Sequence, residues 1–352
     1  ELFKTRFNIK PANKYLTGYK GVVNLALLGQ WQNTLTQFGD LTYSIYKNGL
    51  DNTVKAILEK KDITTKELGI TSIGYEFTEV LDVYKMVDTV FKYSGFRRVD
   101  QFGKETVLNS TIKSFQKQLN NNKLSIRNEN FLNALLPQMI SSKEQIIKDL
   151  KNNNITDDIK FLAFARLLDV QPVSPSNMTP EQMKSLSFRL FTVLKSFTIK
   201  HIDIVRKEGL DDIVQGIDLV KEKRTEEGRK LFFKGVNQLA LLATIFTTIN
   251  TGTDTIKDLI SGKEIYLDDI ITNNLWKFIT LSRYQVEYVK GIDQKIANYI
   301  MPPIPYLTSL EKDRKSFQKW LEDGEKDFGE TLRNIESIRY IPLVGQTVYY
   351  RY

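Results

Sequence analysis

The chain contains few side chains of the types that usually carry catalysis, and its single histidine is the first candidate. His201 is the only histidine among 352 residues, and the chain contains no cysteine. A thiolate nucleophile, a sulfur-ligated metal, a His-based zinc site and most His-dependent triads therefore lack their usual parts. The neighbours of His201 are apolar, which predicts a buried, hydrogen-bonded core histidine.

Carboxylates occur as three adjacent pairs, Asp157/Asp158, Asp211/Asp212 and Asp268/Asp269. Neighbouring residues on a helix point about 100° apart, so such a pair does not converge on one metal ion. Each pair precedes an apolar run, where carboxylates complement the positive end of a helix. We interpret the pairs as helix starts. A hydrolase that works through two carboxylates is an alternative, but no spacing singles out such a pair.

Phosphate-binding loops are not indicated either. The segments 101–106 (QFGKET) and 260–265 (ISGKEI) contain Gly-Lys but lack the spaced first glycine of a P-loop. We therefore predict no catalytic, cofactor-binding or metal-binding residue, and no cofactor.

One helical segment, 187–209 (SFRLFTVLKSFTIKHIDIVRKEG), combines a broad apolar face with flanking cations. At about 100° per residue its large apolar side chains cover roughly half of the helix circumference. This face is predicted to lie in the core or at an interface between subunits, and its members are Leu190, Phe191, Leu194, Phe197, His201 and Ile204.

Cations at the edges of this face and near residue 97 are candidate contacts for phosphates or lipid head groups. The net charge of +8 and the pI of about 9.2 favour polyanionic partners. Tyr93 and Phe96 are aromatic residues available for stacking. The alternative is a solvated rim whose aliphatic stems extend the apolar face. The candidate cations are Arg97, Arg98, Arg189, Lys195, Lys200 and Arg206, with Lys207 beside them.

Helical periodicity fills the chain and strand patterns are nearly absent, which predicts an all-α fold, an elongated multi-helix bundle without significant sheet. The proline-rich loop at 169–180 suggests an N-terminal helical half (1–170) and a C-terminal helical half (171–352), with one continuous helical domain as the alternative. Because the first residue is Glu1, we expect a fragment of a longer chain. The expected helices are 13–48, 51–60, 75–95, 104–120, 128–150, 156–169, 180–207, 210–222, 225–250, 253–260, 266–299, 308–333 and 337–350.

The most apolar stretch, 236–252 (VNQLALLATIFTTINTG), allows two interpretations. It is short for a membrane span, which needs about 20 residues, so a fully buried core helix is favoured over membrane insertion. Gly228, Gly235 and Gly252 accompany it. They indicate either easier local rearrangement or close helix packing.

Four stretches together resemble one protein family: 27–50, 93–112, 172–209 and 338–351. The most specific blocks are GFRRVD (95–100) and the R-x-x-x-x-L-K-x-F-T-x-K pattern that begins at Arg189. They are similar to the long helical C-terminal regions of large polyvalent virion proteins, the internal ejected core proteins of tailed bacteriophages.

The resemblance implies a homo-oligomeric internal virion protein, a ring for example, that leaves the capsid with the genome. Such a protein helps to form a conduit for DNA across the host envelope. Its implied partners are copies of itself, other core or portal proteins, phage DNA and, after ejection, the host membrane. Enzymatic modules of such proteins lie elsewhere in their chains, so no enzyme activity is expected of this region. The alternative function is a nucleic-acid-binding accessory region of a virion-packaged polymerase or another large polyvalent phage protein.

Overall fold

The computed structural model describes residues 34–35, 38–39, 41–70, 89–171, 200–279 and 313. Helices are the only regular elements in these ranges, and no strand occurs among them. The described part of the chain is therefore all-α, as the periodicity predicts. The elongated form of the bundle stays a prediction. Apart from Asp313, the helices expected over 308–333 and 337–350 lie outside the described residues.

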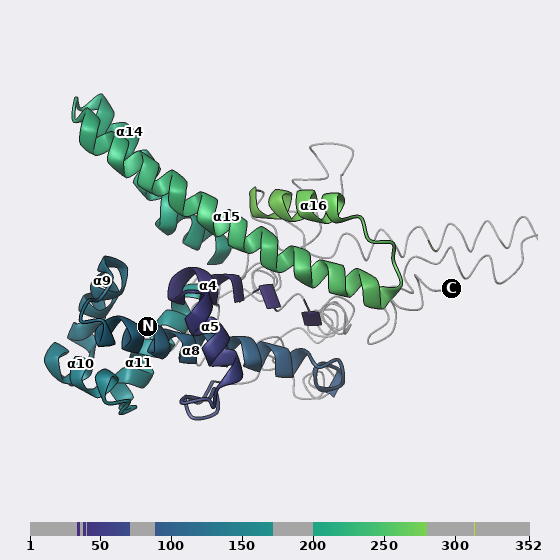
Figure 1. The fold of residues 1–352 in the computed structure, drawn as a ribbon, viewed down its shortest axis with the longest axis horizontal. Helices are drawn as coiled ribbons and strands as arrows, with labels where there is room; N and C mark the ends of the chain where they lie inside the picture. The colour runs from purple at the N-terminus through teal and green to yellow at the C-terminus, as the bar shows by residue number, and fades with distance from the viewer. Residues whose placement is uncertain are drawn as a thin grey trace, which may run out of the picture.

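One long helix, α8 (Phe96–Asn120), forms the centre of the N-terminal part (Figure 1). The helix was expected from residue 104, but it begins at Phe96 after Gly95, which has a positive φ of 78°. Its middle is buried on all sides, including polar residues such as Thr106 and Asn109. Four shorter helices pack on it: α4 (Leu41–Asn48), α5 (Leu50–Leu58), α10 (Lys143–Lys151) and α11 (Asp157–Val170).

Buried polar side chains of α8 hold neighbouring backbone in place. The Asn109 amide oxygen accepts hydrogen bonds from the backbone N–H groups of Asp62 (2.7 Å) and Ile63 (3.1 Å), and its Nδ2 donates to the Ile63 carbonyl (2.8 Å). Glu105 accepts from the backbone N–H of Thr65 at 3.1 Å. These bonds satisfy buried groups that would otherwise destabilise the fold. They fix the 59–65 turn against α8.

The single helix expected over 128–150 is wrong, because the chain forms three elements there. α9 (Ile126–Leu135) passes into the short 3₁₀ helix η2 (Leu136–Gln138), and α10 follows after a break. Pro137 cannot donate a backbone hydrogen bond, so it stops the α-helix. Ser142 then caps α10 by accepting a hydrogen bond from the Gln145 backbone N–H at 3.3 Å.

The C-terminal part contains fewer breaks than expected. Residues 200–205 continue through the π-helical turn η4 (Arg206–Leu210) into α14 (Asp211–Lys221) without leaving helical backbone angles. The break expected between 207 and 210 is therefore wrong, and so is the interpretation of Asp211 and Asp212 as a helix start. The separate helices 225–250 and 253–260 form one helix, α15 (Thr225–Ser261). Asp157/Asp158 and Asp268/Asp269 do stand in the first turns of α11 and α16 (Leu267–Ile279).

The two parts of the chain share one hydrophobic core. Residues of α4, α8, α10 and α11 pack with Ile204, Val205, Leu242, Phe246 and Phe278 in a single cluster. Figure 1 shows α15 running above α4 and α8, with α16 beside one half of α15 and α14 beside the other. The division at residue 170 stays a prediction, while the described residues on both sides of it meet in this core.

Two pairs of glycines allow α14 and the η4 turn to lie directly against α15. A Cβ added at Gly216 would lie 2.7 Å from the carbonyl oxygen of Gly228, and one added at Gly235 would lie 2.6 Å from that of Gly209. Both spacings are closer than carbon and oxygen can approach without a shift. Of the roles considered for Gly228 and Gly235, close packing is the one that the geometry supports.

Replacement of a contact glycine is predicted to destabilise the protein. Gly216→Ala forces the two backbones apart and should lower the free energy of unfolding by about 1–3 kcal/mol, as for other overpacked sites. Gly252→Ala is the matched control, since nothing lies within 4 Å of its added Cβ. Helix propensity alone should make that variant more stable by about 0.5–1 kcal/mol. Urea unfolding followed by circular dichroism measures both, and equal effects of the two changes would contradict the close contact.

Candidate functional site

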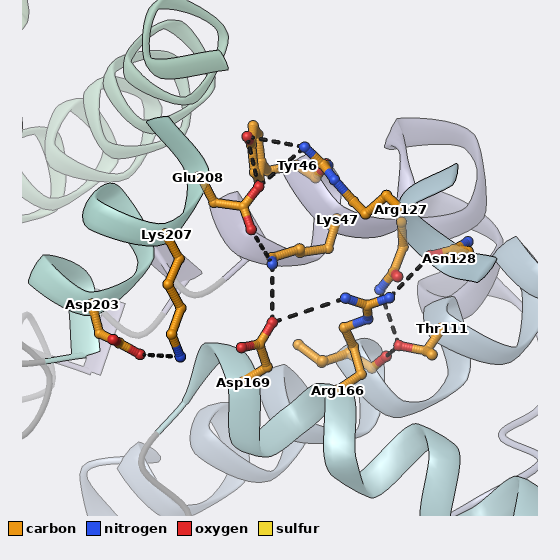
Figure 2. Close-up of polar contacts among 12 residues, drawn as sticks. Tyr46, Lys47, Thr111, Arg127, Asn128, Arg166, Asp169, Asp203, Lys207 and Glu208 are labelled. Atoms are coloured by element: carbon orange, nitrogen blue, oxygen red, sulfur yellow. Dashed lines mark hydrogen bonds and ion pairs between the residues drawn. The ribbon is translucent and has the colours of Figure 1, made fainter. Parts of the chain in front are cut away.

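Charged side chains from four separate elements meet in one partly buried group, which we call the ionic cluster (Figure 2). The cluster comprises Lys47 of α4, Arg127 of α9, Arg166 and Asp169 of α11, and Glu208 of η4. It connects the N-terminal helices with the turn from which α14 continues.

Lys47 is the centre of the ionic cluster. Its side chain is only 6% exposed, and its Nζ donates to Asp169 Oδ2 at 2.9 Å and to Glu208 Oε1. The second carboxylate oxygen of Glu208 lies 3.1 Å from Arg127 Nη2 and accepts a hydrogen bond from the Tyr46 hydroxyl at 3.0 Å. Each carboxylate therefore meets more than one donor, which compensates for the loss of water around the charges.

Arg166 is the most deeply buried cation of the cluster, with a side chain that is 2% exposed. Its Nη2 donates to the Asn128 side-chain oxygen at 2.9 Å, and its Nη1 lies 3.9 Å from Asp169 Oδ2. The guanidinium also stacks over the Phe131 ring at 3.7 Å from the centroid, a cation–π contact. Burial lowers the pKa of Arg166 to about 10, which leaves it charged at neutral pH.

The two carboxyls of the cluster are ionised at neutral pH. Burial is the largest single influence on Asp169 and Glu208 and by itself would raise the pKa of each. The charge of Lys47, together with the neighbouring cations and hydrogen bonds, outweighs burial and lowers both pKa values below the ordinary ones. Burial and the Glu208 charge raise the pKa of Tyr46 to about 12. A general acid for glycoside hydrolysis needs a raised carboxyl pKa, the opposite of what is found here. The ion pairs of the cluster therefore serve to hold helices together.

Sequence reasoning missed the ionic cluster, although one signal was present. Arg166 stands inside the otherwise apolar run of α11 (FLAFARLLDV), on its buried face. A buried arginine needs a carboxylate or another acceptor close by. The local sequence pattern cannot identify which residues pair in the cluster, because Lys47 and Glu208 are 161 residues apart in the chain.

The structure places His201 in the core, 7% exposed, with its Nδ1 hydrogen-bonded to the Tyr43 hydroxyl. Its ring packs against Phe246 (centroids 5.2 Å apart) and edge-on against Phe278 (5.5 Å). Ile204, one turn further along, is also buried. The other predicted members of this face lie outside the described residues: Leu190, Phe191, Leu194 and Phe197.

Two of the candidate phosphate contacts face carboxylates of the same chain. Burial lowers the pKa of Lys200, which also faces Asp169 and Asp203. Arg206 is exposed and pairs with Asp203 at 3.1 Å, and Lys207 pairs with the same carboxylate at 2.8 Å. These contacts bring Lys200 and Arg206 together around Asp203.

The remaining cations lie on other elements. Arg97 and Arg98 are exposed in the first turn of α8, while Arg189 and Lys195 lie outside the described residues. Phe96 is 1% exposed and packs on Phe91 with ring centroids 4.9 Å apart, so it is not available for stacking on a base. Tyr93 is 74% exposed.

The helix α15 is not the fully buried core helix that was favoured for 236–252, and that prediction is wrong. Leu242 and Phe246 are buried, but Val236 and Leu241 are 38% and 53% exposed. Within the described ranges, α15 is long and apolar enough to span a membrane by length and composition, and only 17% of its most apolar 18-residue stretch is buried. The same ranges contain no group of three or more His, Cys, Asp or Glu placed to hold a metal ion.

Comparison with known proteins gives no relative for this chain: no family model, no curated protein and no solved structure matches it.

Removal of the central cation should cost far more stability than removal of an exposed one. Lys47→Met removes the cation that Asp169 and Glu208 share, and Arg127 and Tyr46 remain beside Glu208 alone. Breaking a buried pair costs about 3–5 kcal/mol, and we expect a loss toward the lower end of that range. Lys117→Met is the control, because Lys117 pairs with Asp51 at 2.7 Å where both side chains are 52% exposed. It should change stability little or not at all. Urea unfolding compares the two variants, and similar midpoints would refute the anchoring role of Lys47.

The cluster should also make the folded protein less stable at acidic pH than at neutral pH. The ordinary pKa values are 4.5 for Glu208 and 3.8 for Asp169, and folding lowers both. Protons therefore bind more readily to the unfolded chain, so this stabilisation is present above about pH 5 and is lost as the pH falls through the folded pKa values. The Tm measured from pH 7 to pH 3 should drop less steeply in Glu208→Gln than in the wild type. Parallel curves would show that Glu208 does not contribute.

Proposed function

We propose that this chain is a non-enzymatic internal virion protein of a tailed bacteriophage, which oligomerises and helps to form the conduit for genome delivery across the host envelope. Its location is then the capsid interior and, during infection, the host cell envelope. Its partners are copies of itself, other core or portal proteins, phage DNA and the host membrane.

The observation that carries the proposal is the exposed apolar surface of the hairpin formed by η4, α14 and α15. In Figure 1, α14 and the adjoining half of α15 extend beyond the N-terminal helices. Along this extension Val214 and Phe233 are 55% and 59% exposed. Large apolar surfaces of this kind are typical of proteins that assemble with a partner or bind a membrane.

The ionic cluster supports an assembling rather than a catalytic role. Its carboxylates are held ionised by buried cations, and their contacts join helices that are distant in sequence. Such an anchor gives a projecting hairpin a fixed base. The family-like blocks at 95–100 and 189–200 supply the virion context of the proposal.

The alternative, a nucleic-acid-binding accessory region of a virion-packaged polymerase or another large polyvalent phage protein, has less support. It relies on clustered cations, and Lys200 and Arg206 face carboxylates of the chain itself. Phosphate contacts would have to compete with Asp169 and Asp203.

Quantitative mass spectrometry of intact virions and of capsids that have ejected their DNA tests the proposal. We expect peptides of this chain in intact virions and their depletion from emptied capsids, with the major capsid protein as the constant reference. Retention in emptied capsids would identify a fixed structural component and refute the conduit role. Absence from both particles would refute the virion assignment.

A further inference from the structure

We propose that the adjoining C-terminal ends of α8 and α10 form a contact surface for the phosphate backbone of duplex DNA. This surface, which we call the basic face, consists of Lys123, Lys148 and Lys151 and of the asparagine runs 120–122 and 152–154, all of them exposed. The inference rests on DNA as a partner in the proposed function, and it identifies the part of the chain that contacts it.

The two helices end in the same way and side by side. Asn122 and Asn153 both have a positive φ of 55°, the left-handed conformation that commonly ends a helix. Lys151 Nζ donates to the Asn122 side-chain oxygen at 3.2 Å, and Gln116 Nε2 donates to the Asn153 side-chain oxygen at 2.8 Å. These bonds hold both asparagine runs and Lys151 together on one surface.

The lysines of the basic face are not needed to cap their helices. Lysine near a helix C-terminus often binds the last carbonyl groups. Here backbone N–H groups take that place: Lys123 donates to the Gln118 carbonyl at 3.1 Å, and Asn154 donates to the Asp149 carbonyl at 2.9 Å. An ammonium group has three donors, and the bond to an asparagine uses only one of those of Lys151. Donors therefore remain for a ligand.

Carboxylates close to the basic face are engaged elsewhere. The Asp149 side chain is buried and accepts hydrogen bonds from Gln145 Nε2 at 3.0 Å and Asn154 Nδ2 at 3.1 Å. Glu144 stands at the opposite end of α10, in its first turn, where hydrogen bonds with its own backbone N–H and with Ser142 lower its pKa. Within the described ranges, the three lysines of the basic face form no ion pair with a carboxylate.

The distribution of charge also directs a polyanion to this part of the chain. Lysine and arginine outnumber aspartate and glutamate in residues 41–70 and 89–171, whereas the two kinds of charge are nearly balanced in 200–279. The excess positive charge of the described residues therefore lies in the N-terminal helices. Such an excess attracts a polyanion over a distance and raises the rate of encounter.

The chemistry of the basic face fits the backbone of duplex DNA. Lysine ammonium groups and asparagine amides are both common donors to DNA phosphates. A duplex presents closely and regularly spaced phosphates, so several cations on one surface can each meet one. Lysine and asparagine supply no aromatic ring for stacking on unpaired bases and no apolar group for insertion among lipid tails. Binding without sequence preference follows from this composition.

Fluorescence anisotropy of a labelled duplex of mixed sequence, with the full chain, tests the proposal. Lys123→Gln/Lys148→Gln/Lys151→Gln should bind at least tenfold more weakly than the wild type at physiological salt. Each lost phosphate contact takes about 0.9 from the slope of the logarithm of the binding constant against that of the salt concentration. The slope of the triple variant should therefore be flatter by about 2.7.

A second triple variant separates a local contact from net charge. Lys221→Gln/Lys223→Gln/Lys230→Gln removes the same charge from exposed lysines at and near the tip of the α14–α15 hairpin, and it should leave affinity and slope nearly unchanged. Equal losses in the two triple variants, or a wild type that does not bind the duplex, would overturn the proposal.

Conservative replacement guards against a loss of fold in the first variant. Arginine at positions 123, 148 and 151 keeps the charge and should retain the slope of the wild type. Circular dichroism should show the same helix content in all variants, because the altered side chains are exposed. A flat slope in the arginine variant, with its fold intact, would contradict contacts made through charge.

Two further measurements distinguish DNA from other anionic partners. Flotation with vesicles of phosphatidylcholine and phosphatidylglycerol would refute the proposal if the wild type floats without binding the duplex and the triple glutamine variant does not float. Competition by polyglutamate as effective as that by unlabelled duplex, at equal charge, would refute the assignment to DNA. The mass spectrometry of virions does not enter these experiments, so the virion assignment and the basic face can each fail alone.

Discussion

The contact of Lys47 with two carboxylates is the constraint on which the arrangement of the described helices depends. Asp169 belongs to α11 and Glu208 to the turn before α14, so one ammonium group joins three elements that lie far apart in sequence. Arg127 and Tyr46 hold the other oxygen of Glu208. Since a buried carboxylate without a partner is strongly unfavourable, the turn at 206–210 has few alternative positions. The direction in which the hairpin leaves the N-terminal helices follows from that position.

The core below this cluster is unusually polar for a helical protein, and its order depends on specific hydrogen bonds. Asn109, Glu105 and Ser110 of α8 are buried and bind backbone or side chains of the preceding segment. Apolar packing alone is tolerant of small displacements, whereas a satisfied polar network selects one arrangement. The aromatic group around His201 closes the same core from the C-terminal side. The N-terminal helices and the base of the hairpin thus share one core.

The sequence predicts the fold class well and the long-range contacts poorly. Helical periodicity identifies α5 and α11 to within a few residues, and it identifies the start of α16 equally well, because this signal is local. Pro137 is a local signal that outweighs the periodicity around it. The helical continuation through Arg206–Leu210 depends on a contact that is distant in sequence. Gly209 has the sequence signature of a helix end, but here it stays helical and its lack of a side chain lets α15 pack directly against it. Partners such as Lys47 and Glu208 are chosen by the tertiary fold, so pattern along the chain does not identify them.

The same glycines explain why the hairpin is left with apolar surface. Gly209, Gly216, Gly228 and Gly235 bring two backbones together, so little side-chain surface is buried between them. A coiled coil with leucines at these positions would bury its apolar residues inside the pair. Here the large residues follow the glycines and point to one side, where the described chain offers them no cover. In this packing the apolar side chains on that side of the hairpin stay outside the core that the described helices form.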